Sequence, residues 1–371
     1  MVTTKEKVYD ILNCGPRGRF VANGKVVSNS NLQNLSNRGT GLVIRESMEA
    51  PEGHVLCVLD SSQIEARLLV TWAGQEDRVE MFRRGGDPYN DMASDLYGRP
   101  IDRKNVAEDK KPGGVGKAVV LGAGYGLGWQ NFQGQLRVGF LGMDGVIYDQ
   151  EYVDQLGVNV DGFRVGRSYD DRFDTLEEQA MSCLPLGMDP MQHITHCAVV
   201  WTIVNLYREK NPRVKALWKT MHNALDYMMN GQEVQIGPIR TVKDGLLLPS
   251  GLIMKYTGLR KSKKTGDYSY LKQIRGSGYE EWTKTYGPSL VENCVQAMAR
   301  ILISDSITAT RKAGYNVALT VHDEQVSVVP TAQAQACADT VYKQLCTPPS
   351  WMPNLPLDAS IDIVQNYAEA K

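Results

Sequence analysis

The sequence of 371 residues contains no long hydrophobic run, because its apolar segments are short and interrupted. A membrane-spanning helix needs about 20 consecutive apolar residues, so we expect no transmembrane helix. Residues 1–10 are charged and lack the apolar region of a secretory signal peptide. Both absences favour a cytoplasmic protein.

Paired cysteine motifs and a basic excess are also missing. The seven cysteines are scattered without a CxxC pair, which indicates reduced thiols inside a cell. The net charge of −1 lacks the basic excess typical of nucleic-acid-binding proteins, although an acidic active site can offset a basic groove. The composition, 42% hydrophobic and 22% charged, suffices for a large core in one or two domains.

No internal repeat is visible, and the apolar pattern predicts strands near both ends of the chain with helices between them. The predicted strands are 54–59, short strands within 236–250, a hairpin over 317–329 and 359–364. The predicted helices are 63–73, a segment at 117–121 flanked by a glycine cluster, 199–207, 214–229, 286–311 and 332–346. Residues 133–191 show few periodic signals. This order predicts a discontinuous α+β domain with a helical insertion.

Two short strings, 58–67 (VLDSSQIEAR) and 319–326 (LTVHDEQV), each place an aspartate directly after an apolar, strand-forming run. Asp60 and Asp323 are therefore expected at strand ends, on rigid elements that still face solvent. On neighbouring strands the two carboxylates could hold two divalent cations about 3.5–4 Å apart, as in-line phosphoryl displacement requires. Magnesium needs few protein carboxylates beside water and substrate phosphates. The pattern predicts nucleotidyl transfer.

Residues 60–65 (DSSQIE) resemble motif A of the family A DNA polymerases, the bacterial polymerase I group and its phage relatives. Residues 322–324 (HDE) resemble their motif C, in the matching order and separation. The resemblance extends from Gly18 to the C-terminus. It implies an α+β right-hand palm with an antiparallel sheet and a mainly helical fingers subdomain. We expect the palm at 1–100 and 288–371, and the fingers, with a family-atypical insertion, at 101–287.

The resemblance also implies roles for these residues. Asp60 and Asp323 would be metal ligands, together with the backbone carbonyl of Ser61. Two Mg²⁺ ions would activate the primer 3′-hydroxyl and neutralise the triphosphate and the leaving diphosphate. Lys117 and Glu324 complete the predicted catalytic set. For either aspartate alone, an ordinary capping or turn residue is the alternative.

Glu65 lies five residues after Asp60, at the start of the predicted helix. In the family this glutamate sits under the sugar and excludes a 2′-hydroxyl, whereas the related single-subunit RNA polymerases lack it. A carboxylate favoured by the helix dipole is the simpler interpretation, and both can hold. Gln63 and Ser61 join Glu65 in the predicted substrate site, although Ser61 departs from the family's usual tyrosine.

Residues 113–126 (GGVGKAVVLGAGYG) resemble motif B of the fingers. Lys117 and Tyr125 are eight residues apart, so a helix would present both on one side after about two turns. The resemblance implies that Lys117 binds the triphosphate and that Tyr125 closes over the nascent base pair. The alternative is a glycine-rich turn with a surface lysine.

Two positions of this segment depart from the family pattern. Gly113 replaces an arginine that grips the triphosphate, for which Lys110 or Lys111 could substitute. Leu121, in the predicted substrate site, replaces an aromatic residue. A Walker phosphate loop is excluded, because Lys111 stands where its first glycine belongs and Ala118 replaces the Ser/Thr.

Weaker strings resemble primer and template contacts. Residues 18–20 (GRF), 31–35 (NLQNL) and 292–296 (ENCVQ) correspond to family segments that contact the DNA. Minor-groove donors of this kind test the shape of a base pair and not its sequence. Tyr89 aligns with a family histidine near the β-phosphate and joins the substrate site. The predicted DNA-contacting residues are Arg19, Gln33, Asn34, Arg67, Gln296 and His322.

Two further clusters of residues could serve either in ligand binding or only in the structure. Residues 255–275 carry seven basic residues, one acidic residue and three tyrosines, which fits either a strand-tracking surface or a solvated hairpin. His193, His196 and Cys197 suggest a metal triad, but no fourth ligand follows at a suitable spacing, so zinc is not predicted.

These features predict a magnesium-dependent DNA-directed DNA polymerase whose partners are primer-template DNA and dNTPs and which does not bind membranes. In relatives a thumb, and usually an exonuclease domain, precede the matched region, and we expect neither in this chain. A separate polypeptide carrying them would make this chain one subunit of a split enzyme. A polymerase-like DNA-binding module without activity, favoured by Gly113, is the other alternative. A phage-encoded chain would act in the host cytoplasm.

Overall fold

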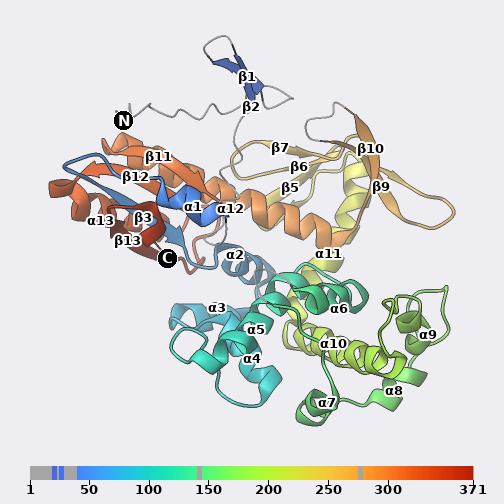
Figure 1. Cartoon of the computed structure of the whole chain (residues 1–371). Helices are drawn as coiled ribbons and strands as arrows, with labels where there is room; N and C mark the ends of the chain where they lie inside the picture. The colour runs from blue at the N-terminus through green and yellow to red at the C-terminus, as the bar shows by residue number, and fades with distance from the viewer. Residues whose placement is uncertain (1–18, 23–24, 29–39, 140–143, 275–278, 371) are drawn as a thin grey trace.

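The computed structural model describes residues 19–22, 25–28, 40–139, 144–274 and 279–370. Within these ranges, no helix combines the length and the apolar character that crossing a membrane requires. One part of the molecule is built around a β-sheet with long helices against it, and the other part is a group of helices (Figure 1). The segments that form the sheet come from both ends of the chain.

The main sheet is antiparallel, with the strand order β11-β12-β3-β13. Its strands are β3 (His54–Ser61), β11 (Asn316–Val321), β12 (Glu324–Pro330) and β13 (Ala359–Val364). The prediction of these strands is confirmed, and β3 runs two residues further than expected. Glu324 of β12 lies opposite Asp60, which has Ser360 of β13 on its other side. Asp60 is therefore fixed within a central strand.

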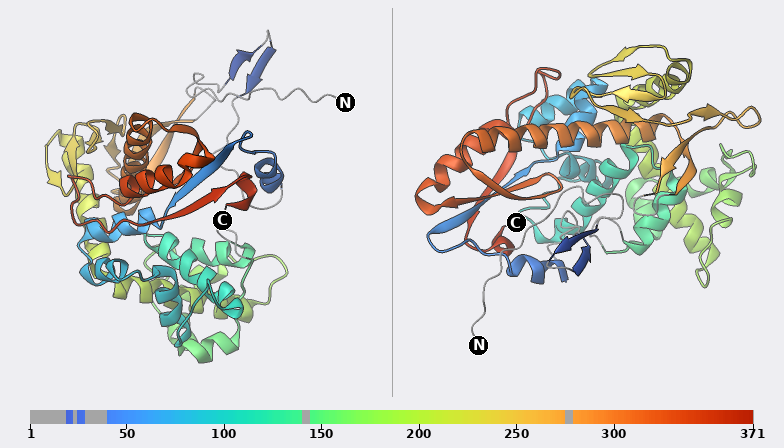
Figure 2. Two further views of the ribbon diagram at one scale, coloured as in Figure 1. Left: turned by 90° about the vertical axis from the view of Figure 1, so that its left-hand side faces the viewer. Right: turned by 90° about the horizontal axis from the view of Figure 1, so that it is seen from above.

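The two faces of this sheet are covered differently. Side chains alternate along β3, so Cys57 and Leu59 point to one face and Leu56 and Val58 to the other. The first face contributes to the largest apolar core. That core also receives residues of α2 (Ile64–Ala73), α11 (Pro212–Asn230), α12 (Gly287–Lys312) and α13 (Ala334–Leu345). The other face packs under α1 (Thr40–Glu46) and the 3₁₀ turn η4 (Tyr367–Glu369), as Figure 2 shows.

A second apolar core is formed by α4 (Pro88–Tyr97), α5 (Lys110–Ala123), α6 (Trp129–Val138), α7 (Gln150–Leu156), α8 (Val160–Val165), α9 (Leu176–Met181) and α10 (Pro190–Lys210). Helix α3 (Glu76–Arg83) packs with α2 in a separate small core, and the 3₁₀ turn η2 (Ala107–Asp109) directly precedes α5. The stretch 133–191, which showed few periodic signals, contains several of these helices. Helices α7, α8 and α9 in this stretch are only six or seven residues long, which is too short to display a helical period.

Three smaller antiparallel sheets complete the fold. Their strands are β1 (Arg19–Ala22), β2 (Lys25–Ser28), β4 (Gln235–Ile236), β5 (Ile239–Val242), β6 (Gly245–Leu247), β7 (Ile253–Lys255), β8 (Arg260–Lys261), β9 (Tyr268–Gln273) and β10 (Glu280–Thr285). Residues of β5, β6 and β9 belong to the same apolar core as α11 and the main sheet. The predicted boundaries after residues 100 and 287 stay predictions.

The predicted helix at 117–121 is confirmed as part of α5, and this helix extends further than expected, over Gly113, Gly114, Gly116 and Gly122 of the flanking cluster. A side chain at Gly116 would place its Cβ 2.1 Å from the carbonyl oxygen of Tyr89. At Gly113 the Cβ would lie 2.4 Å from the Cβ of Arg103. Glycine is required here because α4 and the following segment approach the backbone of α5 closely.

This close approach predicts opposite effects of one substitution at two helical glycines. Gly116→Ala should lower the free energy of unfolding by about 1–3 kcal/mol, because the added methyl group overlaps the Tyr89 carbonyl. Gly134→Ala in α6 should raise it by up to about 1 kcal/mol, because nothing lies within 4 Å of the added Cβ and alanine favours the helix. Urea denaturation measures both. Equal effects of the two substitutions would contradict the close approach.

Candidate active site

The two predicted aspartates come together at one end of the main sheet. Asp60 is the penultimate residue of β3, and Asp323 lies in the two-residue turn between β11 and β12. The amide N–H of Ser61 donates a hydrogen bond of 3.2 Å to the carbonyl oxygen of Asp323. His322, in the same turn, has a φ of 51°, a left-handed conformation that non-glycine residues seldom adopt. The turn is thus tied by its backbone to the end of β3.

The two carboxylates oppose each other electrostatically. Burial, reinforced by the charges of Asp323 and Glu324, raises the pKa of Asp60 to about 7. Burial also raises the pKa of Asp323 above its usual range. Like charges held together in a partly buried place favour a bound proton or a bound cation. A bound cation at this site would therefore be stabilised by both carboxylates.

Lys117 supplies one such charge from α5. Burial, and then the nearby cation of Arg103, lower the pKa of Lys117, whereas Asp323, Asp60 and Asp87 act in the opposite direction. Lys117 therefore lies within electrostatic reach of both site aspartates and of a second cation. The sequence predicted the lysine at this site, and the structure brings it there.

Arg103 and Asp87 are neighbours of Lys117 that sequence reasoning missed. The Nη2 of Arg103 lies 3.1 Å from the Oδ2 of Asp87, and the guanidinium covers the ring of Tyr89 at 4.8 Å. Asp87 also caps α4, accepting hydrogen bonds from the amides of Tyr89 and Asn90. The Asp87-Pro88 pair is a helix-start signal that could have marked Asp87. No sequence signal marks Arg103, which lies in a loop.

Glu65 and Tyr125 form a second pair at the site. The phenolic oxygen of Tyr125 donates a hydrogen bond of 3.1 Å to Oε2 of Glu65. Burial raises the pKa of Glu65, and this hydrogen bond acts against the rise. The pKa of Tyr125 is raised by burial and by Glu65. Tyr125 follows the end of α5 at Ala123, so the prediction that one helix carries both Lys117 and Tyr125 was wrong.

Glu324 is buried beneath the aspartates. Its Oε2 lies 3.7 Å from Nη2 of Arg45, another cation that the sequence did not reveal. Burial raises the pKa of Glu324, while the neighbouring Tyr367 hydroxyl and the charge of Arg45 lower it. Glu324 therefore interacts with α1 and with the C-terminal segment as well as with Asp60. Its predicted catalytic role stays a prediction.

The other predicted substrate residues surround this group. Gln63 precedes α2 in a left-handed conformation, with a φ of 52°. Leu121 lies one turn after Lys117 in α5 and is half-buried. Tyr89 is buried, with 5% of its surface exposed, in the first turn of α4. No ligand contact tests their predicted roles.

The predicted DNA-contacting residues are more dispersed. His322 and Gln296 are exposed. Arg67 is buried, donates to the carbonyl oxygens of Ser62 and Pro356, and covers the ring of Phe82 at 4.4 Å. Of the other three, Arg19 is described only as part of the backbone of β1. Gln33 and Asn34 lie outside the described residues.

The basic segment 255–275 forms much of the sheet β8–β10 as far as it is described. Several of its charges already have partners. Arg260 lies over the ring of Trp282 at 3.2 Å, and Lys261 lies 3.5 Å from Asp226. Asp267 pairs with Lys284 at 2.8 Å. The choice between a strand-tracking surface and a solvated hairpin stays open.

Metal ligands are sparse in the described part of the chain. It contains no group of three or more His, Cys, Asp and Glu side chains placed to hold a metal ion. In the group His193, His196 and Cys197, for which zinc was not predicted, both ring nitrogens of His196 have backbone partners. Its Nε2 lies 3.0 Å from the Gln133 carbonyl oxygen, and its Nδ1 accepts a hydrogen bond from the Tyr148 amide. Asp60 and Asp323 do fit Mg²⁺, because that ion accepts two carboxylates when water and phosphates supply the other ligands.

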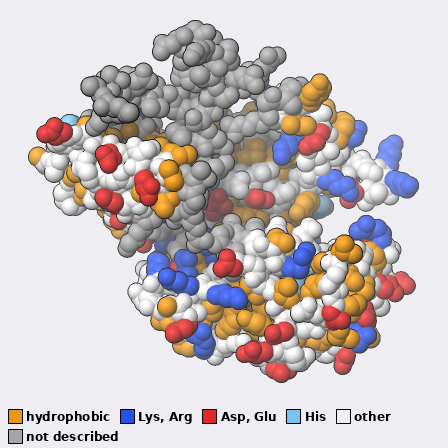
Figure 3. All heavy atoms as spheres, viewed as in Figure 1, with side chains coloured by type: hydrophobic (Ala, Val, Ile, Leu, Met, Phe, Trp, Pro, Cys, Tyr) orange, Lys and Arg blue, Asp and Glu red, His pale blue; other side chains and the backbone are white. Residues whose placement is uncertain are grey.

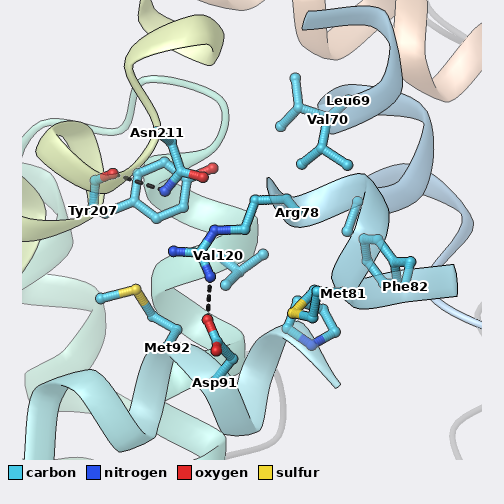
Figure 4. A pocket seen from close by; sticks show the side chains of 12 residues that line it. Leu69, Val70, Arg78, Met81, Phe82, Asp91, Met92, Val120, Tyr207 and Asn211 are labelled. Atoms are coloured by element: carbon cyan, nitrogen blue, oxygen red, sulfur yellow. Dashed lines mark hydrogen bonds and ion pairs between the residues drawn. The ribbon is translucent and has the colours of Figure 1, made fainter. Parts of the chain in front are cut away.

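A pocket lies between α2, α3, α4 and α5 (Figure 4). Apolar side chains of α2, α4 and α5 surround it, and the ion pair of Arg78 with Asp91 crosses it. Asn211 donates a hydrogen bond of 2.8 Å to the carbonyl of Tyr207 at its edge. None of the predicted site residues lines it. Figure 3 instead shows acidic side chains in the hollow between the two parts of the molecule, with basic side chains along the lower rim.

Comparisons with known proteins find similarity to DNA polymerases. The family model "DNA polymerase family A" matches residues 18–151. A DNA polymerase of Bacillus phage SP02 is 26% identical over 338 residues, which are 88% of this chain and 43% of the phage protein. The thermostable DNA polymerase I of Thermus thermophilus is 35% identical over 112 residues, 30% of this chain and 13% of its own length.

A solved structure extends the similarity to the fold. The POL domain of Pol1 from M. smegmatis, in complex with DNA primer-template and dNTP, has a TM-score of 0.54 at 16% identity. The match covers 91% of this chain and 44% of that chain. It confirms the predicted α+β polymerase fold. The chain spans less than half the length of the phage polymerase and of this structure.

The Glu65–Tyr125 hydrogen bond predicts a change in a measurable pKa. Tyr125→Phe should raise the pKa of Glu65 further, because the lost donor stabilised the ionised carboxylate. Carboxyl-detected NMR titration reports this pKa. Tyr169→Phe, at a fully exposed tyrosine, is the matched control and should leave it unchanged. An unchanged or lower Glu65 pKa in Tyr125→Phe would contradict the hydrogen bond.

Proposed function

We propose that this chain, which resembles the family A DNA polymerases, extends a DNA primer on a template by two-metal nucleotidyl transfer from dNTPs. The observation that supports this most is the meeting of Asp60 and Asp323 at the sheet end. Burial raises the pKa of both carboxylates, and the charge of Asp323 raises that of Asp60 further, so the pair favours binding of a cation in place of a proton.

Asp60, Asp323 and the backbone carbonyl of Ser61 would hold two Mg²⁺ ions. When bound, the ions supply charge for activating the primer 3′-hydroxyl and stabilising the leaving diphosphate. The aspartates contribute position, because β3 and the adjoining hairpin turn hold them on a rigid sheet. Preorganised charge of this kind needs little rearrangement during the reaction.

Lys117 would bind the triphosphate and donate a proton to the leaving diphosphate. Its lowered pKa supports this role, because a less basic ammonium is a stronger acid. Glu65, hydrogen-bonded to Tyr125, would close the space that a 2′-hydroxyl needs. A preference for dNTPs over ribonucleotides would follow, which separates this proposal from an RNA polymerase.

The subdomain boundaries, the position of the DNA, the cellular location and a partner polypeptide also belong to the proposal. Palm segments at 1–100 and 288–371 would carry the aspartates and the fingers at 101–287 would carry Lys117 and Tyr125. Primer-template DNA would lie near the exposed residues Gln296 and His322. The cytoplasmic location and a separate thumb or exonuclease polypeptide are kept as predictions. If that polypeptide exists, adding it should increase DNA affinity and product length together.

The proposal predicts that neither aspartate can be replaced. Asp60→Asn and Asp323→Asn should each slow primer extension by at least about a hundredfold, as losing preorganised charge stabilisation does in other enzymes. A gel assay of single-nucleotide addition to a labelled primer with Mg²⁺ measures this rate. Fold and DNA binding should persist, because Asn keeps the shape of Asp.

Asp305→Asn is a suitable control, since this exposed acid of α12 lies outside the site. Its extension rate should equal that of the unmodified chain. Near-normal extension by either site variant would contradict the two-metal assignment. Absence of extension by the unmodified chain, with correct folding and DNA binding, would instead favour the inactive DNA-binding module.

A further inference from the structure

We propose that Arg103 binds the triphosphate of the incoming nucleotide, side by side with Lys117. The inference rests on the proposed polymerase function and identifies a residue that no motif of the chain indicates. It also answers the question raised by Gly113, at which the arginine of the family pattern is missing.

The stem of Arg103 lies on the bare surface of α5 at Gly113. A Cβ built on Gly113 would be 2.4 Å from Cβ, 2.8 Å from Cδ and 3.0 Å from Cγ of Arg103. No side chain at position 113 could coexist with this arrangement. Because Gly113 is four residues before Lys117, both lie on one face of α5, a single turn apart. Arg103 therefore passes along the face that carries the lysine.

The guanidinium is held but not enclosed. Its Nε and Nη2 donate to Oδ2 of Asp87, at 3.3 and 3.1 Å, and its plane covers Tyr89. Among the described residues no acceptor for its Nη1 is found, and 24% of the side chain is exposed. Packing and the ion pair thus fix the orientation of a planar donor set while leaving one edge for a ligand. Such an edge suits the paired oxygens of a phosphate group.

The charges around Arg103 indicate what the ligand is. Arg103 and Lys117 are two cations near enough to repel, as the effect of Arg103 on the pKa of Lys117 shows. Asp87 compensates only one of them. The lysine also senses Asp60 and Asp323, where divalent cations would bind. An anion with several charges, able to contact both cations and to reach the metal site, is a polyphosphate.

Lys110 and Lys111, the substitutes suggested by the sequence, are placed differently. Both are exposed residues in the first turn of α5. Position 111 is two residues before Gly113 and faces another side of the helix, whereas position 110 lies one turn before Gly113, at the exposed start of α5. They provide matched controls, because each has the same charge in the same segment.

The test measures dNTP binding without turnover. A primer ending in a dideoxynucleotide traps the complex of enzyme, primer-template and dNTP, and its dissociation constant is read by fluorescence. Arg103→Ala should weaken dNTP binding by at least about tenfold, because a hydrogen-bonded charge is lost. Primer-template affinity should stay unchanged, and so should the weak binding of a dNMP. Lys110→Ala and Lys111→Ala should bind dNTP normally.

Asp87→Asn separates ligand binding from a structural role. Asn can still cap α4, but it no longer neutralises Arg103. A triphosphate-binding Arg103 should then hold dNTP at least as tightly as before. If Arg103 serves only to anchor Asp87, Arg103→Ala and Asp87→Asn should both lower stability and leave the dNTP dissociation constant unchanged, which would overturn the inference.

A charge swap gives the second test. Gly113→Arg alone should disturb the fold or the site, because it overlaps Arg103. The double variant Arg103→Gly with Gly113→Arg should recover most of the dNTP affinity that Arg103→Gly loses. A folded double variant without recovery would contradict the shared location. If the unmodified chain extends primers but Arg103→Ala binds dNTP normally, this inference fails alone. If the unmodified chain neither binds dNTP nor extends primers, the proposed function fails.

Discussion

The candidate site depends on the strand pairing that holds two partly buried carboxylates near each other. Asp60 and Asp323 can approach only because β3 and β12 pair in one register, with Glu324 opposite Asp60. A slip by one residue would turn the side chain of Asp60 to the opposite face of the sheet. The Ser61–Asp323 backbone hydrogen bond closes the same junction. Lys117 supplies positive charge to this pair, whereas Glu324 adds a further negative charge beside Asp60.

The positive charge comes from Lys117 of α5 and from Arg103 in the loop that precedes η2 and α5. Glycines at 113 and 116 let α5 accept the Arg103 stem and the Tyr89 carbonyl at contact distance. A glycine-rich helix is intrinsically unstable, since glycine costs about 1 kcal/mol relative to alanine. In this protein the glycines stand where α5 must pack closely against Arg103 and Tyr89, next to the two cations that lie near the acids. The glycines therefore make α5 less stable as an isolated helix, but they make room for the arginine beside Lys117.

Sequence patterns predicted the elements whose signals are local. The apolar run before Asp60, the hairpin around Asp323 and the long helix before it were recoverable, because periodicity and turn residues mark them. Arg103 and Arg45 were not, because their partners depend on tertiary packing between segments that share no motif. The extension of α5 over part of the glycine cluster was not predicted either, because intrinsic propensity opposes a helix there and tertiary contacts override it.

The central claim is that Asp60 and Asp323 hold two cations together. Electron paramagnetic resonance of Mn²⁺, added to the chain with a dideoxy-terminated primer-template and dNTP, tests this directly. Two ions about 3.5–4 Å apart should give a spin-coupled spectrum, and Asp60→Asn should abolish the coupling. A spectrum of isolated Mn²⁺ in the unmodified complex, or coupling that survives Asp60→Asn, would contradict the account.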